Sequence, residues 1–167
     1  PNFKSIKEDN GIRGDTTAEG IANLKPAFDR KYGTFTAANS SFLTDGAAAT
    51  LIMTEDKALE LNLRPKSRII DFAFTGQSLD DELLLGPAYA IPKVLQKTGL
   101  TLDDIDVFEL HEAFAGQVLA VLKALESDAF ATEKLGLKQM LGKIPMEKIN
   151  TQGGSLSIGH PFGATGA

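Results

Sequence analysis

The 167-residue chain contains no cysteine. Without a thiol it can form no disulfide, no zinc site with thiolate ligands and no cysteine nucleophile within its own length. Histidine is scarce as well, because the chain carries only His111 and His160. Any imidazole chemistry in this chain must therefore come from these two residues.

Several other features are lacking, and each argues against a class of protein. There is no uninterrupted apolar run near the length of a membrane span, and no basic-then-apolar targeting segment among the first residues. A formal net charge of −5 argues against a surface for nucleic acid or anionic membranes. What is present is an ordinary globular balance, 43% hydrophobic and 23% charged residues, which is enough to bury a core in one domain.

Helical and extended patterns alternate along the chain in the order β-α-β-α-β-α. Strands are predicted over residues 47–53, 68–75 and 105–110, with a brief one at 155–158. Helices are predicted from a capping box at Thr16 through 24, from the cap Thr54 through 61, from Ile91 to the αL cap Gly99, over 111–126, and briefly within 127–150. In the fourth of these, Phe114, Val118, Val121, Leu122 and Leu125 share one face. A layered α/β architecture is expected.

The stretch "ELHEAFA" (109–115) places His111 where a predicted strand passes directly into a helix. Ligands bind at the carboxyl ends of strands in open α/β sheets, and a helix N-terminus offers unpaired N–H groups there. Glu112, in the first helical turn, suits the helix dipole. The alternative interpretation is structural: a hydrogen-bonded, partly buried histidine, a capping glutamate, and Phe114 as plain core.

The stretch "GHPFGATG" (159–166) holds the second histidine. Pro161 biases His160 toward an extended backbone and suits the first position of a new helix. The surrounding glycines allow tight turns or a close approach to a ligand. The arrangement is suited to a general base or a hydrogen-bond donor. Its alternative is a glycine-rich turn with a surface histidine, while phosphate-loop and dinucleotide motifs fail on spacing.

Three ordered stretches resemble the thiolases, which use coenzyme A to cleave 3-ketoacyl-CoA or, in reverse, condense two acyl-CoA units. They are "KPAFDRKYGTFTAANSSFLTDGAAA" (25–49), "HEAFA" (111–115) and "GGSLSIGHPFGATGA" (153–167). Among thiolases, "HEAF" in place of the commoner "NEAF" is most similar to β-subunits of the trifunctional complexes of fatty-acid β-oxidation and their bacterial counterparts.

The resemblance implies roles for individual residues. His160 matches the histidine that activates the nucleophilic cysteine and donates a hydrogen bond to the thioester oxyanion. His111 stands where the family's asparagine holds a water of the same oxyanion hole. Ser41 matches a serine that binds the pantetheine arm of coenzyme A. Phe28 and Phe114, with Ala113 beside them, match the apolar lining of that arm.

The resemblance also implies a thiolase-like layered α/β fold that is only partly present. Residues 1–40 correspond to the end of the loop domain and 41–167 to an incomplete C-terminal domain. Coenzyme A is expected as a substrate, with no cofactor and no metal. The expected partners are a second thiolase subunit and a hydratase/dehydrogenase α-subunit, for which 127–150 is a candidate contact surface. The expected location is mitochondrial in a eukaryote and cytoplasmic in a bacterium.

Because both thiolase cysteines are missing from these residues, we expect the 167-residue chain to be inactive by itself. Two alternatives stay open at this point. The chain is a non-catalytic acyl-CoA-binding or subunit-interaction module, or it is an unrelated α/β ligand-binding domain.

Overall fold

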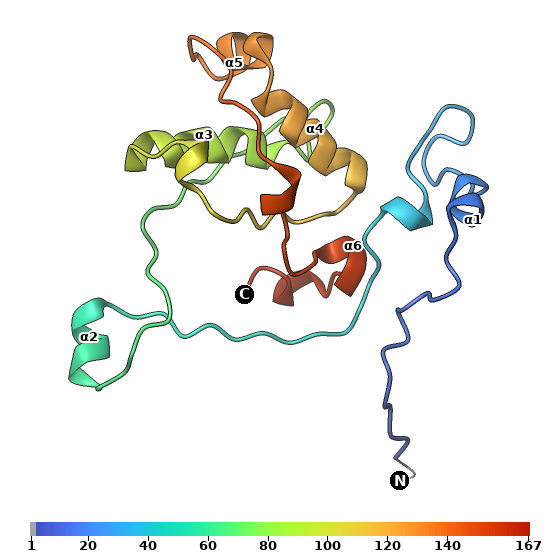
Figure 1. Ribbon diagram of the computed structural model, residues 1–167, viewed down its shortest axis with the longest axis horizontal. Helices are drawn as coiled ribbons and strands as arrows, with labels where there is room; N and C mark the ends of the chain where they lie inside the picture. The colour runs from blue at the N-terminus through green and yellow to red at the C-terminus, as the bar shows by residue number, and fades with distance from the viewer. Residues whose placement is uncertain (1–2) are drawn as a thin grey trace.

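The structure, a computed structural model, describes residues 3–167 and is built on helices joined by long extended segments (Figure 1). The helices are α1 (Ala18–Ala22), α2 (Glu55–Glu60), α3 (Gly86–Thr98), α4 (Ala115–Leu125), α5 (Asp128–Lys134) and α6 (Ser155–Ile158). Single 3₁₀ turns lie at Ala37–Asn39, Leu102–Asp104, Met146–Lys148 and Phe162–Ala164. The predicted loop-domain segment begins at residue 1, so its first two residues lie outside the described range.

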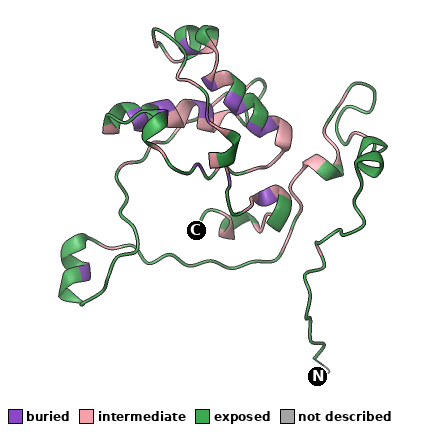
Figure 2. Ribbon diagram, in the orientation of Figure 1, coloured by how far each residue is buried: buried purple, intermediate pink, exposed green. Residues whose placement is uncertain are grey.

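The core lies between α3 and α4, with α5 packed on α4. Figure 2 shows the buried residues gathered on these helices, while the N-terminal segment and α2 are almost wholly exposed. Four residues of the predicted face of α4 are buried, namely Val118, Val121, Leu122 and Leu125. Burying a side chain of this size contributes about 1.5–3 kcal/mol. The apolar face predicted from the 3.6-residue period is therefore confirmed, with Phe114 half-buried at the N-cap.

The predicted strands do not pair into a sheet among the described residues. Residues 47–53 and 68–75 run extended, with Leu51 79% and Ile70 69% exposed. Residues 105–110 form a single parallel bridge, Phe108 to Ile149, and 155–158 is the short helix α6. The strand predictions are thus wrong for this part of the chain. A strand needs a neighbour to accept and donate its ladder hydrogen bonds, and local pattern carries no information on whether that neighbour is present.

Helix boundaries differ from the predictions in several helices, among them α3 and α1. Helix α3 begins at Gly86 and keeps Pro92 in its interior, where the prediction started the helix near Ile91. Pro92 is buried against the core, so packing offsets the hydrogen bond that its missing N–H forfeits. Gly99 is the αL cap, as predicted, with φ 71°. Thr17, and not Thr16, caps α1, because its hydroxyl accepts from the Gly20 N–H at 3.0 Å.

Two local predictions are confirmed. Thr54 caps α2 by accepting from the Lys57 N–H at 3.3 Å, as its place before an acidic first turn indicates. The segment 127–150 consists of the short helix α5 followed by a loop.

Candidate active site

The fold brings His111 and His160 together, although 48 residues separate them in the chain. Their ring centroids lie 4.3 Å apart with an angle of 45° between the ring planes. His111 precedes α4, and His160 follows α6. Both of the chain's imidazoles therefore share one site.

His111 does not stand at a strand-to-helix junction of the predicted kind. Helix α4 starts four residues later, at Ala115, and the backbone before His111 is held instead by the buried Asn150. The Asn150 side chain accepts from the Leu110 N–H at 2.7 Å and donates to the Leu110 carbonyl at 2.8 Å. The Asn150 side chain thus satisfies both backbone groups of Leu110, which a neighbouring strand would do in a sheet.

Glu112 has a different role from the predicted one. It lies outside α4, and its carboxylate accepts from the Asn150 amide at 2.7 Å and from the Leu156 N–H of α6 at 3.1 Å. Glu112 therefore ties the His111 segment to α6, the helix that leads into His160. The prediction that Glu112 lies in the first helical turn was wrong, and so was the alternative interpretation of Glu112 as a cap, because α4 begins at Ala115 and no side chain caps it by a hydrogen bond.

Each imidazole is oriented by a hydroxyl group. His111 Nδ1 lies 2.8 Å from Ser155 Oγ, and His160 Nδ1 lies 2.8 Å from Thr165 Oγ1. Since Nδ1 is engaged in both rings, Nε2 is the nitrogen that each ring leaves for a ligand. Because a hydroxyl can either donate or accept a hydrogen bond, these contacts are compatible with either tautomer of each imidazole.

The backbone around His160 is held against residues 42–44. The His160 N–H donates to the Phe42 carbonyl at 2.8 Å, and His160 forms a parallel bridge with Leu43. Gly159 takes φ 90°, and a Cβ there would collide with Thr44. The extended setting predicted for His160 is confirmed, and this glycine is needed for the close approach.

We expect the pKa of His111 to lie below the ordinary imidazole value. Partial burial of the ring is the main cause, the charge of His160 adds to it, and the Glu112 carboxylate opposes it. His160→Gln should therefore raise the pKa of His111, and Glu112→Gln should lower it further. Titration of the imidazole proton signals by NMR measures both shifts, and shifts of opposite sign would contradict this assignment.

The same pKa predicts how stability depends on pH. As the pH falls through about 6.5, the unfolded chain takes up a proton at His111 before the folded chain does. The contribution of His111 to stability is therefore present above that pH and is lost as the pH falls toward the lower folded pKa.

The residues assigned to the pantetheine arm lie next to this pair. The Ser41 N–H donates to the Ala113 carbonyl at 2.9 Å. The rings of Phe28 and Phe114 meet edge to face, with centroids 5.7 Å apart. Phe35, which sequence reasoning missed, packs on both at 6.4 and 5.1 Å. The three phenylalanine rings thus form an aromatic cluster, in which Phe28 remains 73% exposed.

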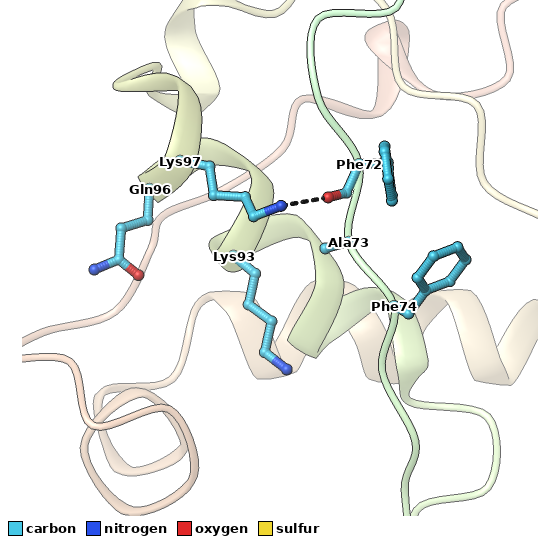
Figure 3. Close-up of a pocket in the computed structure, with 6 residues that line it drawn as sticks. All are labelled: Phe72, Ala73, Phe74, Lys93, Gln96 and Lys97. Carbon is cyan, nitrogen blue, oxygen red and sulfur yellow. Dashed lines mark hydrogen bonds between the residues drawn. The ribbon is translucent and has the colours of Figure 1, made fainter.

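A separate pocket lies between α3 and the extended segment 72–74 (Figure 3). It has a volume of about 420 Å³, and its wall is tied by the Lys97 ammonium, which donates to the Phe72 carbonyl at 2.8 Å. None of the predicted site residues lines this pocket.

Across residues 3–167, no three His, Asp or Glu side chains are grouped to hold a metal ion. Within the same range, no helix has the length and apolar character to cross a membrane.

Comparison with known proteins decides the family. Residues 63–167 match the family model for the thiolase C-terminal domain, and residues 1–56 match that for the N-terminal domain. The chain belongs to the thiolase family. Although the predicted strands do not pair among residues 3–167, the fold is thiolase-like and partial. The dimeric peroxisomal thiolase of Saccharomyces cerevisiae matches 96% of the chain, with a TM-score of 0.74 and 41% sequence identity. The chain covers 36% of that structure.

Two thiolase relatives are more similar in sequence. The mitochondrial trifunctional enzyme subunit beta of Bos taurus is 58% identical over 99% of the chain, and the chain covers 35% of that protein. A probable 3-ketoacyl-CoA thiolase of Caenorhabditis elegans is 59% identical over 98% of the chain, with 36% of that protein covered. The chain thus spans about a third of the length of these thiolases.

Sequence reasoning missed several residues that hold the two histidines in place or lie against them. Ser155 and Thr165 lie inside the glycine-rich stretch 153–167. The sequence shows that they carry hydroxyl groups, but not that these groups contact His111 and His160. Asn150 sits just before that motif with φ 46°, a backbone state that only Gly and, less often, Asn adopt readily. Phe162 also has a positive φ, 42°, and its ring lies 4.9 Å from His160. An Asn ahead of a glycine pair was the one available signal.

Proposed function

We propose that these 167 residues are part of a 3-ketoacyl-CoA thiolase, an acetyl-CoA C-acyltransferase of fatty-acid β-oxidation, and that they supply its two histidines. The observation that carries the proposal is the pairing of His111 and His160 at 4.3 Å between ring centroids. The Ser41 N–H donates to the carbonyl of Ala113, two residues after His111. The chain has no cysteine, so the thiol nucleophile comes from residues outside these 167.

His160 is the base in this proposal. With Nδ1–H donating to Thr165 Oγ1, the neutral ring leaves Nε2 free to take the proton of the thiol. Once protonated, Nε2–H donates to the oxyanion that develops on the thioester carbonyl. Thr165 can accept throughout both steps, so the ring keeps its orientation.

His111 supplies the second hydrogen bond to that oxyanion, directly or through a water. Two donors aimed at one developing charge lower the barrier more than a single donor does. A neutral His111 suits this role beside a charged His160, because two adjacent imidazolium groups repel each other. The lowered pKa of His111 supports this assignment.

Coenzyme A is the proposed substrate, with no separate cofactor or metal. Ser41 would bind the amide portion of the pantetheine arm, and Phe28, Ala113 and Phe114 would line its apolar part. Residues 1–40 would belong to the loop domain and 41–167 to the C-terminal domain. A second thiolase subunit and a hydratase/dehydrogenase α-subunit are the proposed protein partners. The proposed location is mitochondrial in a eukaryote and cytoplasmic in a bacterium.

The absence of cysteine favours a second candidate function. In it, the chain is a non-catalytic module that binds acyl-CoA or a subunit. The enzyme requires a cysteine nucleophile and the module has none. A measurement that shows whether the native polypeptide extends beyond these 167 residues therefore separates the two candidates.

The intact mass of the polypeptide, purified from its source organism, is the test. We expect a mass more than twice that of these 167 residues, and release of acetyl-CoA from 3-ketoacyl-CoA and coenzyme A. A mass equal to that of the 167 residues, with binding of coenzyme A and no turnover, would support the module instead. Failure to bind coenzyme A at all would contradict both the enzyme and the acyl-CoA-binding module, and would support a module that binds a subunit.

A further inference from the structure

The two histidines of the site have different chemical tasks and different hydroxyl partners. A base at Nε2 requires its proton on Nδ1, whereas a neutral donor at Nε2 requires Nδ1 to be free of a proton. Ser155, which faces His111, is 4% exposed, while Thr165, which faces His160, is half-buried. The two hydroxyls therefore differ in burial, and the two histidines that they contact differ in task.

The direction of the Ser155 hydrogen bond follows from its burial. A serine hydroxyl has one proton to donate, and a buried donor without an acceptor costs about 1–3 kcal/mol. Within the described range, His111 Nδ1 is the one hydrogen-bond partner of Ser155 Oγ, at 2.8 Å. If His111 donated, the Ser155 proton would have no acceptor there. If Ser155 donates, both groups are satisfied.

We propose that Ser155 is a positioning residue that donates its proton to His111 Nδ1 and holds His111 as the Nε2–H tautomer. The ring then presents a fixed N–H at the site, on the side away from Ser155. Ser155 sits at the first position of α6, and Glu112 binds the next residue of that helix at Leu156 N–H. The helix and the segment that carries His111 are thus joined at two adjacent points, which fixes the geometry of the pair.

The charged and titratable groups around His111 are His160, whose ring lies 4.3 Å away at a tilt of 45°, and Glu112, next to it in the chain. Neither contacts His111 Nδ1 in place of Ser155. The tautomer is therefore set by the hydroxyl and not by an ion pair.

The test is long-range ¹H–¹⁵N correlation NMR on the full polypeptide that contains this chain, above the pKa of His111. We expect His111 Nδ1 to show the shift of an unprotonated nitrogen and Nε2 that of a protonated one. In Ser155→Ala the two shifts should move toward each other as the tautomers mix, and Ser155→Thr should restore the difference. A protonated Nδ1 in the unsubstituted protein would overturn the proposal.

The matched control is Ser157→Ala, in the same short helix. Among residues 3–167, Ser157 Oγ bonds only to Gly154, the N-cap of α6: it accepts from the Gly154 N–H at 3.1 Å and donates to the Gly154 carbonyl at 2.9 Å. This variant should leave the His111 shifts in place, which separates loss of the hydroxyl from loosening of α6. A change as large as that in Ser155→Ala would assign the effect to helix stability and overturn the proposal.

The catalytic consequence rests on the proposed function. In Ser155→Ala, kcat for 3-ketoacyl-CoA cleavage should fall about tenfold with KM little changed, because the donor acts on the transition state. An unaltered kcat beside mixed tautomers would overturn the positioning role. If the unsubstituted protein shows no thiolysis, the proposed function fails, while the NMR result still decides the tautomer.

Discussion

Replacing His160 with alanine is expected to lower kcat for 3-ketoacyl-CoA cleavage by about 10³-fold or more in the full polypeptide. General-base catalysis typically contributes about 10²- to 10⁴-fold, and loss of one oxyanion donor costs about 10²- to 10³-fold. His160 is assigned both tasks, and effects of groups that act together are not additive. Steady-state measurement of kcat and KM with a 3-ketoacyl-CoA substrate tests this expectation.

The control for His160→Ala is Gln152→Ala, an exposed position in the loop before the glycine pair. This variant should keep the kcat of the unsubstituted protein. Binding of coenzyme A, measured by calorimetry, should persist in His160→Ala because the imidazole acts on the reacting carbonyl and not on the pantetheine arm. If His160→Ala retained a tenth of kcat or more, its assignment as the base would be wrong.

The second large effect concerns stability. Asn150→Ala should lower the free energy of unfolding by about 2–4 kcal/mol, since buried groups left unpaired cost about 1–3 kcal/mol each. Asn150 is 9% exposed, and its side chain serves both backbone groups of Leu110 and the carboxylate of Glu112. Its φ of 46° adds a conformational cost for alanine. Urea denaturation of the full polypeptide measures the change.

Asn150→Gly separates the two causes. Glycine tolerates the positive φ but makes none of the side-chain hydrogen bonds, so this variant should lose most of the same stability. Full recovery in Asn150→Gly would show that backbone strain alone matters and that the hydrogen bonds do not. Gln152→Ala should stay within about 0.5 kcal/mol of the unsubstituted protein, as expected for a surface position.

Local sequence was a good guide wherever a short stretch decides its own structure. The αL cap at Gly99, the hydroxyl cap at Thr54 and the apolar face of α4 all follow from interactions within one or two helical turns. The start of α3 was misjudged because Pro92 is tolerated by packing, which involves residues far away in the chain. The strands were misjudged because pairing requires a neighbour, and among residues 3–167 only isolated bridges form.

The sequence by itself determined the family and the chemical groups available: two histidines, no thiol, and three motifs in thiolase order. Only the tertiary structure decided that the two imidazoles share a site, that Asn150 and Glu112 hold the first of them, and that separate hydroxyls engage each Nδ1. The physical reason is range. Backbone preference and side-chain chemistry act over a few residues, whereas a 2.8 Å hydrogen bond between His111 and Ser155 depends on how every segment between them packs.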